Sequence, residues 1–265
     1  MIVYTCIVGD YDWVLPPVWR SANARFICYT DRPSRSISGW ELKPVDACLL
    51  GCPPAMINRW YKLLPHEHLP SSEWSLYMDG HIRLISDPLP LIVEAERLEA
   101  KMALPIHPFR TSIWEEQAAC LAQGKILPDE VSTLESQLRF YKEEGFDCQV
   151  PLTENNILLR KHEDPSVVNA MTEWWGQLDR FTKRDQISLP YVLWKSRLPL
   201  WVLPYSSKTE NSYFRFVAHK KGRSSLASYI QARRYHNLAW HWAYQGVRGY
   251  RYLERLMQNV RSGRD

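Results

Sequence analysis

One stretch, Trp74–Ile82, constrains the fold and the chemistry of this chain more than any other. It begins with the apolar and aromatic residues typical of a buried strand and ends in Asp79, Gly80 and His81. Side chains two residues apart on an extended segment point to the same side, so Asp79 and His81 can reach one ligand together. Open α/β sheets bind ligands at such strand ends. The stretch therefore predicts a metal or phosphate site, although a turn capped by Asp79 with an exposed His81 fits equally well.

Strands and helices are expected to alternate along most of the chain. Short apolar runs predict strands, and apolar residues at helical spacing predict helices. The strands are expected at 2–8, 25–30, 40–45, 74–78, 101–105, 157–160 and 200–204, and the helices at 54–64, 86–100, 112–122, 128–144, 166–181 and 187–195. Such alternation predicts an α/β fold with a mostly parallel central sheet and helices on both faces.

The chain divides into a core and a basic tail. Its 265 residues, 45% of them apolar, fit one large α/β domain with an appendage, which we expect at 1–205 and 206–265. From Lys220 onward, basic residues far outnumber the acidic Glu254 and Asp265. This asymmetry predicts a helical extension drawn to lipid headgroups, nucleic acid or another anionic surface, although a solvated helical face also explains it.

Cysteine usage and hydropathy predict a cytoplasmic protein. Six cysteines are scattered through the chain, and the close pair Cys48 and Cys52 lacks the second pair that a zinc site requires. The N-terminal run reads as a first strand without a basic lead, and no apolar run approaches the roughly 20 residues that span a bilayer. We therefore expect a reducing setting, with the basic tail in peripheral contact with the inner face of a membrane.

Polar residues also follow the first two strands. Gly9, Tyr11 and Asp12 come after the first strand and Asp31 after the second, at the sheet edge where ligands bind. The helix expected at 54–64 carries a cationic pair, Arg59 and Lys62, on one face. Such a pair suits a phosphate group, although surface salt bridges would use the same residues.

Several short motifs occur in a fixed order along residues 1–200. They are Gly9-Asp10-Tyr11-Asp12, Phe26–Asp31, Asn58–His66, Ser75–Gly80, His107–Arg110 and Arg184-Asp185-Gln186. Together, and above all through Asn58–His66, they resemble the glycosyltransferase-like family that includes the plant mucilage-related hexosyltransferases. The basic tail lies outside this resemblance.

The resemblance implies a GT-A-type fold, a single Rossmann-like domain that binds a nucleotide-activated sugar at the carboxyl ends of its strands. In such enzymes an Asp-X-Asp element holds a divalent cation on the diphosphate, and Asp79-Gly80-His81 occupies that place here. Oxygen ligands suit Mg²⁺, whereas an imidazole favours Mn²⁺ or a softer ion. Alternatively, His81 donates a hydrogen bond to a phosphate. His219 resembles the late histidine that GT-A enzymes often bring to the metal, although beside lysines it also suits a surface.

Sugar transfer assigns roles to the remaining polar residues. Negative charge grows on the leaving diphosphate, which Asp79 with a cation, Arg59 and Lys62 are expected to stabilise. The expected donor-binding residues are Gly9, Tyr11, Asp12, Asp31, Arg59, Lys62, His107 and Arg110, and the expected catalytic residues are Asp185, Gln186 and Glu154. Asp185 is the preferred general base or donor-aligning group, unless it caps the following helix. Glu154 alternatively pairs with an arginine, Arg160 or Arg184.

These expectations combine into one functional hypothesis. The chain is expected to be a hexosyltransferase that moves a hexose from a nucleotide-diphosphate sugar to a polysaccharide or lipid-linked glycan. The alternative is a non-catalytic sugar- or nucleic-acid-binding module, which the basic tail and the many aromatic residues favour. Internal acids such as Asp10, Asp79 and Asp185 argue against nucleic-acid binding by the core. A phosphohydrolase of the aspartyl-phosphate type fits poorly, because His81 stands where its second carboxylate belongs.

Overall fold

A computed structural model describes residues 1–33, 36–147, 149–220 and 226–261, without the side chains of 255, 256 and 258–261. Some residues of the sequence-based predictions lie outside this description, namely Cys148, Lys221, Gly222, Arg223, Arg264 and Asp265. The described cysteines, Cys6, Cys28, Cys48, Cys52 and Cys120, are free.

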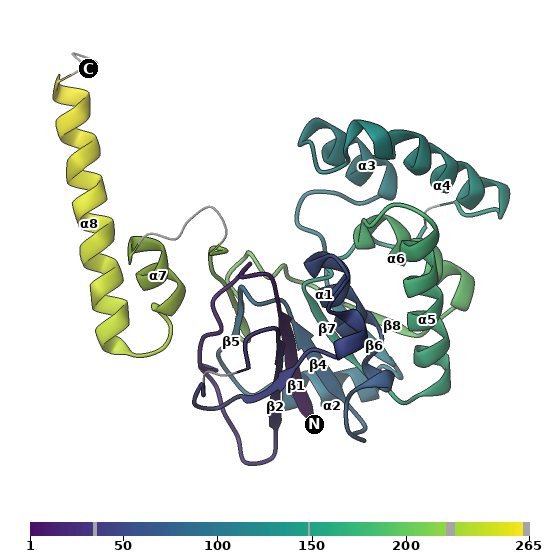
Figure 1. The fold of residues 1–265 in the computed structure, drawn as a ribbon, viewed down its shortest axis with the longest axis horizontal. Coiled ribbons are helices and arrows are strands. Elements are labelled where there is room, and N and C mark those ends of the chain that lie inside the picture. Colours follow the sequence, from purple (N-terminus) through teal and green to yellow (C-terminus); the bar gives the residue numbers. More distant parts are fainter. Residues whose placement is uncertain (34–35, 148, 221–225, 262–265) are drawn as a thin grey trace.

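Within the described residues, a seven-stranded sheet forms the centre of the molecule (Figure 1), in the order β3-β2-β1-β4-β7-β6-β8. These strands are β1 (Ile2–Ile7), β2 (Arg25–Thr30), β3 (Glu41–Pro44), β4 (Ser75–Met78), β6 (Met102–Pro105), β7 (Ile157–Arg160) and β8 (Leu200–Leu203). β7 runs antiparallel to its neighbours β4 and β6, and the other strands all run in one direction. The carboxyl ends of β1, β2 and β4 therefore meet at one edge of the sheet.

Helices cover both faces of this sheet because its strands carry apolar side chains on both sides. Tyr4 and Cys6 of β1 pack into one hydrophobic cluster, whereas Val3 between them packs into the other. The first cluster contains residues of α1 (Pro54–Leu63), α3 (Ile113–Ala122), α4 (Val131–Glu143), α5 (Pro165–Arg180) and α6 (Asp185–Ser196). The second contains α2 (Leu89–Arg97) and a two-stranded sheet of β5 (Ile82–Leu84) and β9 (Phe214–Phe216). Short 3₁₀ turns lie at Ala47–Leu49, Pro65–Glu67 and Pro128–Glu130.

This topology confirms the expected α/β fold, with a mostly parallel central sheet and helices on both faces. Each predicted strand and helix of the core is present within a few residues of its expected bounds. The pairing of β5 with β9 was not expected, because each strand is only three residues long.

The C-terminal extension is helical, as expected. It contains α7 (Leu226–Arg233) and the long α8 (Leu238–Arg261), which stands at the edge of the molecule in Figure 1. The predicted boundary at residue 205 precedes β9, whose Phe214 is fully buried in the core. We therefore propose that the core extends to about residue 220. Among the described residues, no helix combines the length and the apolar character needed to cross a membrane.

Candidate functional site

A cleft of about 690 Å³ lies at the carboxyl ends of β1 and β4. From β1 the chain adds β2 and β3 on one side of the sheet and then adds β4 on the other side, so the order of the strands changes direction between β1 and β4. Such a reversal is where open α/β sheets bind ligands. Its lining includes most of the predicted site residues, namely Gly9, Tyr11, Asp12, Arg59, Lys62, Asp79, His81, Glu154, Asp185, Gln186 and His219.

Two glycines allow the loop after β1 to pack closely against its neighbours, the start of α1 and the turn after β4. Gly9 has a positive φ of 64°, and a Cβ atom there would lie 2.8 Å from Pro54 Cβ at the start of α1. A Cβ atom on Gly80 would lie 3.0 Å from Asp12 Cβ and 3.0 Å from Ile7 Cδ1. Glycine at position 80 thus lets the Asp12 carboxylate approach the end of β4.

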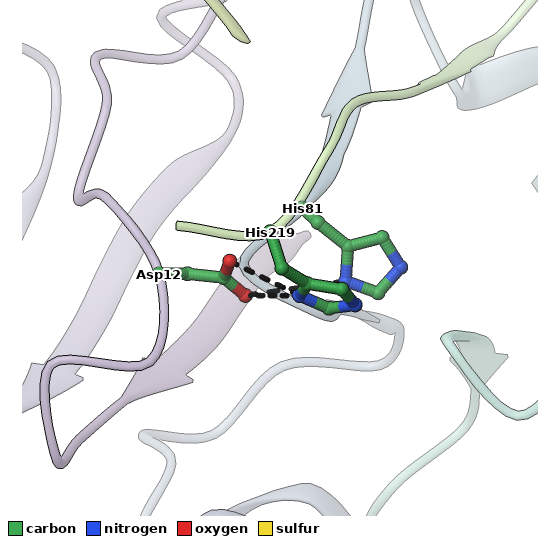
Figure 2. Close-up of side chains that lie close together, drawn as sticks. All are labelled: Asp12, His81 and His219. Atoms are coloured by element: carbon green, nitrogen blue, oxygen red, sulfur yellow. Dashed lines mark hydrogen bonds and ion pairs between the residues drawn. The ribbon is translucent and has the colours of Figure 1, made fainter. Parts of the chain in front are cut away.

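Asp12, His81 and His219 form a cluster of potential metal ligands (Figure 2). The three residues come from the loop after β1, the end of β4 and the segment after β9. Nδ1 of His219 lies 3.1 Å from each carboxylate oxygen of Asp12, and Nδ1 of His81 lies 4.0 Å from Oδ2 of Asp12. The pairing of β5 with β9 brings His219 here, and Val217 N donates to His81 O at 2.9 Å.

This cluster fits a divalent cation. Its ligand atoms all lie within 4.8 Å of one another, whereas ligands that each lie about 2 Å from a shared ion are at most about 4 Å apart, so the side chains would move slightly inward to bind one. Nδ1 of His81 is buried and has no hydrogen-bond partner within the described part of the chain. Burial and the neighbouring His219 lower the pKa of His81 to about 3, so its imidazole is neutral at pH 7, the form that binds metals. Two nitrogen donors and one carboxylate suit Mn²⁺ or Zn²⁺ better than Mg²⁺.

The structure thus groups His81 and His219, as expected, but with Asp12 instead of Asp79. Asp79 lies in the same cleft, where Tyr77 Oη donates to its Oδ1 at 2.8 Å. Tyr77 Oη in turn accepts a hydrogen bond from Asn58 Nδ2 at 3.2 Å. Burial raises the pKa of Asp79 above its ordinary value, an effect that the nearby Lys62 opposes. Asp79 is therefore held in place as part of a buried network and does not cap a turn.

Lys62 links two carboxylates of the cleft. Its Nζ donates to Asp185 Oδ2 at 2.7 Å and lies 3.9 Å from Asp79 Oδ1. Burial alone would raise the pKa of Asp185, but Lys62 and then Arg59 lower it to about 2. Asp185 is therefore ionised at neutral pH. It is the first residue of α6, and the preceding Arg184 occupies the N-cap position, so Asp185 is not a capping residue.

Glu154 and its neighbours Asn155 and Asn156 also line the cleft. Glu154 Oε2 accepts hydrogen bonds from Ser206 Oγ at 2.9 Å and Ser207 N at 2.6 Å. Its Oε1 lies 3.5 Å from Lys208 Nζ. Within the described part of the chain, Glu154 thus pairs with Lys208, and neither Arg160 nor Arg184 pairs with it. Gln186 Nε2 donates to Thr153 O at 3.3 Å, which ties α6 to the segment before β7.

Three predicted residues do not line the main cleft. Asp31 lies in an adjoining hollow of about 210 Å³, where its Oδ2 accepts a hydrogen bond from Gly9 N at 2.9 Å. His107 Nδ1 accepts hydrogen bonds from the backbone of Phe109 and Arg110. Arg110 pairs with the buried Glu116 of α3. His107 and Arg110 therefore shape the loop before α3. The sequence did not indicate this role, because a histidine in a loop can equally bind a ligand or hold the loop in place.

The cleft also contains residues that sequence reasoning did not select. They are Asn58, Lys125, Asn155, Asn156, Arg184 and Lys208. Asn155 Nδ2 and Asn156 Oδ1 are buried without hydrogen-bond partners among the described residues. Buried polar atoms are usually hydrogen-bonded, so these two atoms are suited to bind a polar ligand. A Glu-Asn-Asn run before a strand was the available signal for them.

The chain is similar in sequence to known proteins. The model of the TOD1/MUCI70 glycosyltransferase-like domain matches residues 53–219. Among curated proteins, the chain is 34% identical over 141 residues to a probable hexosyltransferase, MUCI70, and 32% identical over 150 residues to an alkaline ceramidase, TOD1, both from Arabidopsis thaliana. These alignments cover 49% and 52% of this chain but only 23% and 31% of those two proteins.

Similar solved structures include a galactosyltransferase, LgtC, in complex with donor and acceptor sugar analogues, and the apo form of mouse xyloside xylosyltransferase 1. Each has a TM-score of 0.43, with sequence identities of 11% and 9%. The matches cover 76% of this chain and 73% and 84% of those chains.

Proposed function

The chain belongs to the TOD1/MUCI70 glycosyltransferase-like domain family, and on that premise we propose that it is a nucleotide-sugar-dependent hexosyltransferase. In this proposal, it moves a hexose from a nucleotide-diphosphate sugar to a polysaccharide or lipid-linked glycan. The observation that carries the proposal is the cleft in which a potential metal cluster, a buried lysine and two partly buried carboxylates converge.

The leaving diphosphate binds on the side of the cleft next to Asp12, His81 and His219. These residues hold a divalent cation, Mn²⁺ by preference, which when bound neutralises the charge that grows on the phosphate oxygens. Arg59 of α1 lines the same cleft and adds a second positive charge. The loop Gly9–Asp12 and the adjoining hollow near Asp31 receive the nucleoside.

Asp185 aligns the donor sugar and does not act as a general base. A carboxylate with a pKa of about 2 is a weak proton acceptor at neutral pH, because the lysine that lowers the pKa also lowers the basicity. An ionised Asp185 can accept hydrogen bonds from sugar hydroxyls and stabilise positive charge at the anomeric carbon. Gln186 supplies further polar contacts for the sugars, as does Nδ2 of Asn155, which has no hydrogen-bond partner among the described residues.

A second candidate function, metal-assisted hydrolysis, is favoured by the donor set of the cluster. Two histidines and one carboxylate beside an open cleft are typical of catalytic zinc sites, in which the metal activates a water molecule. In this alternative the chain cleaves ceramide, the substrate in the name of its relative TOD1.

One experiment separates these functions. The full chain is incubated with Mn²⁺ and a panel of nucleotide sugars, and with Zn²⁺ and ceramide, and the released nucleoside diphosphate or fatty acid is measured by mass spectrometry. The proposal predicts nucleotide release that Asp185→Asn lowers by about 100-fold and that Asp179→Asn, an exposed acid at the end of α5, leaves unchanged.

Other outcomes contradict the proposal in distinct ways. Release of fatty acid alone supports the hydrolase. Nucleotide sugars that raise the melting temperature without any turnover indicate a non-catalytic sugar-binding module. Absence of both binding and turnover for every nucleotide sugar overturns the assignment.

A further inference from the structure

The long helix α8 is held to the molecule by one of its faces. Trp240 and Tyr244 of α8 contact the guanidinium groups of Arg233 and Arg234 in and after α7, at 4.7 and 5.0 Å from the ring centres. In Figure 1, α7 lies between α8 and the body of the molecule. α7 itself packs on the core through Ala232, which joins a cluster with Leu15 and Val217.

The opposite face of α8 is apolar and exposed. Trp242, Leu253 and Met257 are separated by 11 and 4 residues, so they lie in one row along the helix, and their exposed fractions are 69%, 57% and 54%. Leu238 and Tyr250 flank this row and are also exposed. We call these five side chains the outer face of α8. No side chain in the described part of the chain covers it.

The segment that carries this outer face is strongly basic. Residues 226–261 contain Arg233, Arg234, Arg248, Arg251, Arg255 and Arg261 but only one acid, Glu254. Arg248 and Arg251 are exposed and lie away from the outer face on the helix. A helix with aromatic and aliphatic residues on one face and arginines on the others is typical of helices that lie in the headgroup region of an anionic bilayer.

We propose that α8 lies in the surface of an anionic lipid bilayer, with its outer face buried among the acyl chains. The charge favours this occupant over a second copy of the chain, because two copies that paired these faces would bring the two arginine-rich segments together. Long arginine side chains can instead reach lipid phosphates while the helix is partly immersed. Trp242 and Tyr250 suit the boundary between headgroups and acyl chains.

Attachment through α8 would also position the cleft. Tyr229 of α7 lines the hollow that adjoins the main cleft, together with Asp31 and Trp13. The helix pair therefore connects the membrane surface to this hollow, where the proposed function, on which this placement rests, locates the nucleoside of the donor.

The test is flotation of the full chain with vesicles of phosphatidylcholine containing 30% phosphatidylglycerol, compared with pure phosphatidylcholine. We expect the chain to float with the anionic vesicles and Leu253→Glu/Met257→Glu to lower the partition coefficient at least about tenfold. The matched control is Leu89→Glu/Val93→Glu on α2, since these residues are also four apart and 54% and 58% exposed. The control variant should float like the unaltered chain. Arg248→Gln/Arg251→Gln should lower the preference for anionic vesicles.

Three results would overturn the proposal. One is failure of the full chain to bind either vesicle, and another is unchanged flotation of Leu253→Glu/Met257→Glu. The third is a dimer of the unaltered chain, measured by light scattering, that this double substitution dissociates while vesicle binding is absent. Far-ultraviolet circular dichroism verifies that the variants remain folded, so loss of binding reports the outer face itself.

Discussion

Lys62 supplies the positive charge between two carboxylates of the cleft. Its Nζ donates a hydrogen bond to Asp185 and lies 3.9 Å from Asp79. The ammonium group and the Asp185 carboxylate are both largely buried. Removing one partner of a buried ion pair leaves the other charge uncompensated, whereas removing both is much less costly.

We therefore expect Lys62→Met to lower the free energy of unfolding by about 3 kcal/mol and the added Asp185→Asn to restore most of it. Urea denaturation of both variants measures this coupling. Lys195→Met, which removes an exposed partner of Glu144, should cost less than about 1 kcal/mol. Equal destabilisation in the single and double variants would show that the pair does not set the charge state of Asp185.

His68 gives the molecule a pH dependence that is separate from the cleft. Its Nε2 lies 2.9 Å from Tyr61 O, and burial lowers its pKa to about 3. The unfolded chain, with a histidine pKa near 6.5, binds a proton there that the folded protein excludes. The stability contributed by neutral His68 is thus fully present above about pH 6.5 and is lost as the pH falls toward 3.

Between about pH 4 and 6, His68→Gln should flatten the slope of the unfolding free energy against pH by about 1.4 kcal/mol per pH unit. Denaturant titrations at several pH values provide the slopes for both proteins. Parallel slopes would mean that His68 is protonated in the folded protein.

The turn after β4 requires a glycine at position 80 because the Asp12 loop packs directly against it. A Cβ atom at position 80 would press on Asp12 and Ile7 at 3.0 Å. Gly80→Ala should therefore displace the Asp12 loop, weaken Mn²⁺ binding about tenfold and cost about 1 kcal/mol of stability. Calorimetric titration of Mn²⁺ and thermal unfolding measure the two effects.

The matched control for this substitution is Gly176→Ala in α5, where a Cβ atom meets nothing within 4 Å. Alanine in the middle of a helix should raise stability by about 0.5–1 kcal/mol and leave Mn²⁺ binding unchanged. If the Gly80→Ala variant bound Mn²⁺ as tightly as the unaltered chain, the absence of a Cβ atom at position 80 would not be required for the Asp12 loop to reach the site.

The elements of the core were predictable because each has a strong local signal. β1 is a continuous apolar run, and α1 begins with prolines and carries apolar residues at helical spacing. The presence of Asp79 and His81 in the cleft was predictable from the buried strand that ends just before them, whereas the grouping of His81 with Asp12 and not with Asp79 was not. That contact depends on the packing of β1 against β4 and on β9, a three-residue strand whose partner lies more than 120 residues earlier.

At the scale of the whole molecule, we propose a core that ends near residue 220 and is followed by a helical attachment. A chain that ends at residue 237, before α8, should unfold cooperatively and bind Mn²⁺ like the full chain but lose vesicle binding. A chain that ends at residue 205 lacks β9 and His219 and should lose both stability and Mn²⁺ binding. Circular dichroism melts and Mn²⁺ titrations compare the two. If the chain that ends at residue 205 kept its stability and its Mn²⁺ binding, the boundary of the core would lie at residue 205, as the sequence predicted.

The central claim is that Asp12, His81 and His219 hold a divalent cation against the diphosphate of a nucleotide sugar. The most direct test is isothermal titration calorimetry of UDP, GDP and ADP, each with and without Mn²⁺, on the full chain and on His81→Gln/His219→Gln. We expect Mn²⁺ to strengthen the binding of at least one nucleotide about tenfold or more in the full chain and to have no effect in the double variant. Nucleotide affinity that is unchanged by Mn²⁺, or that Mn²⁺ raises equally in both proteins, would contradict it.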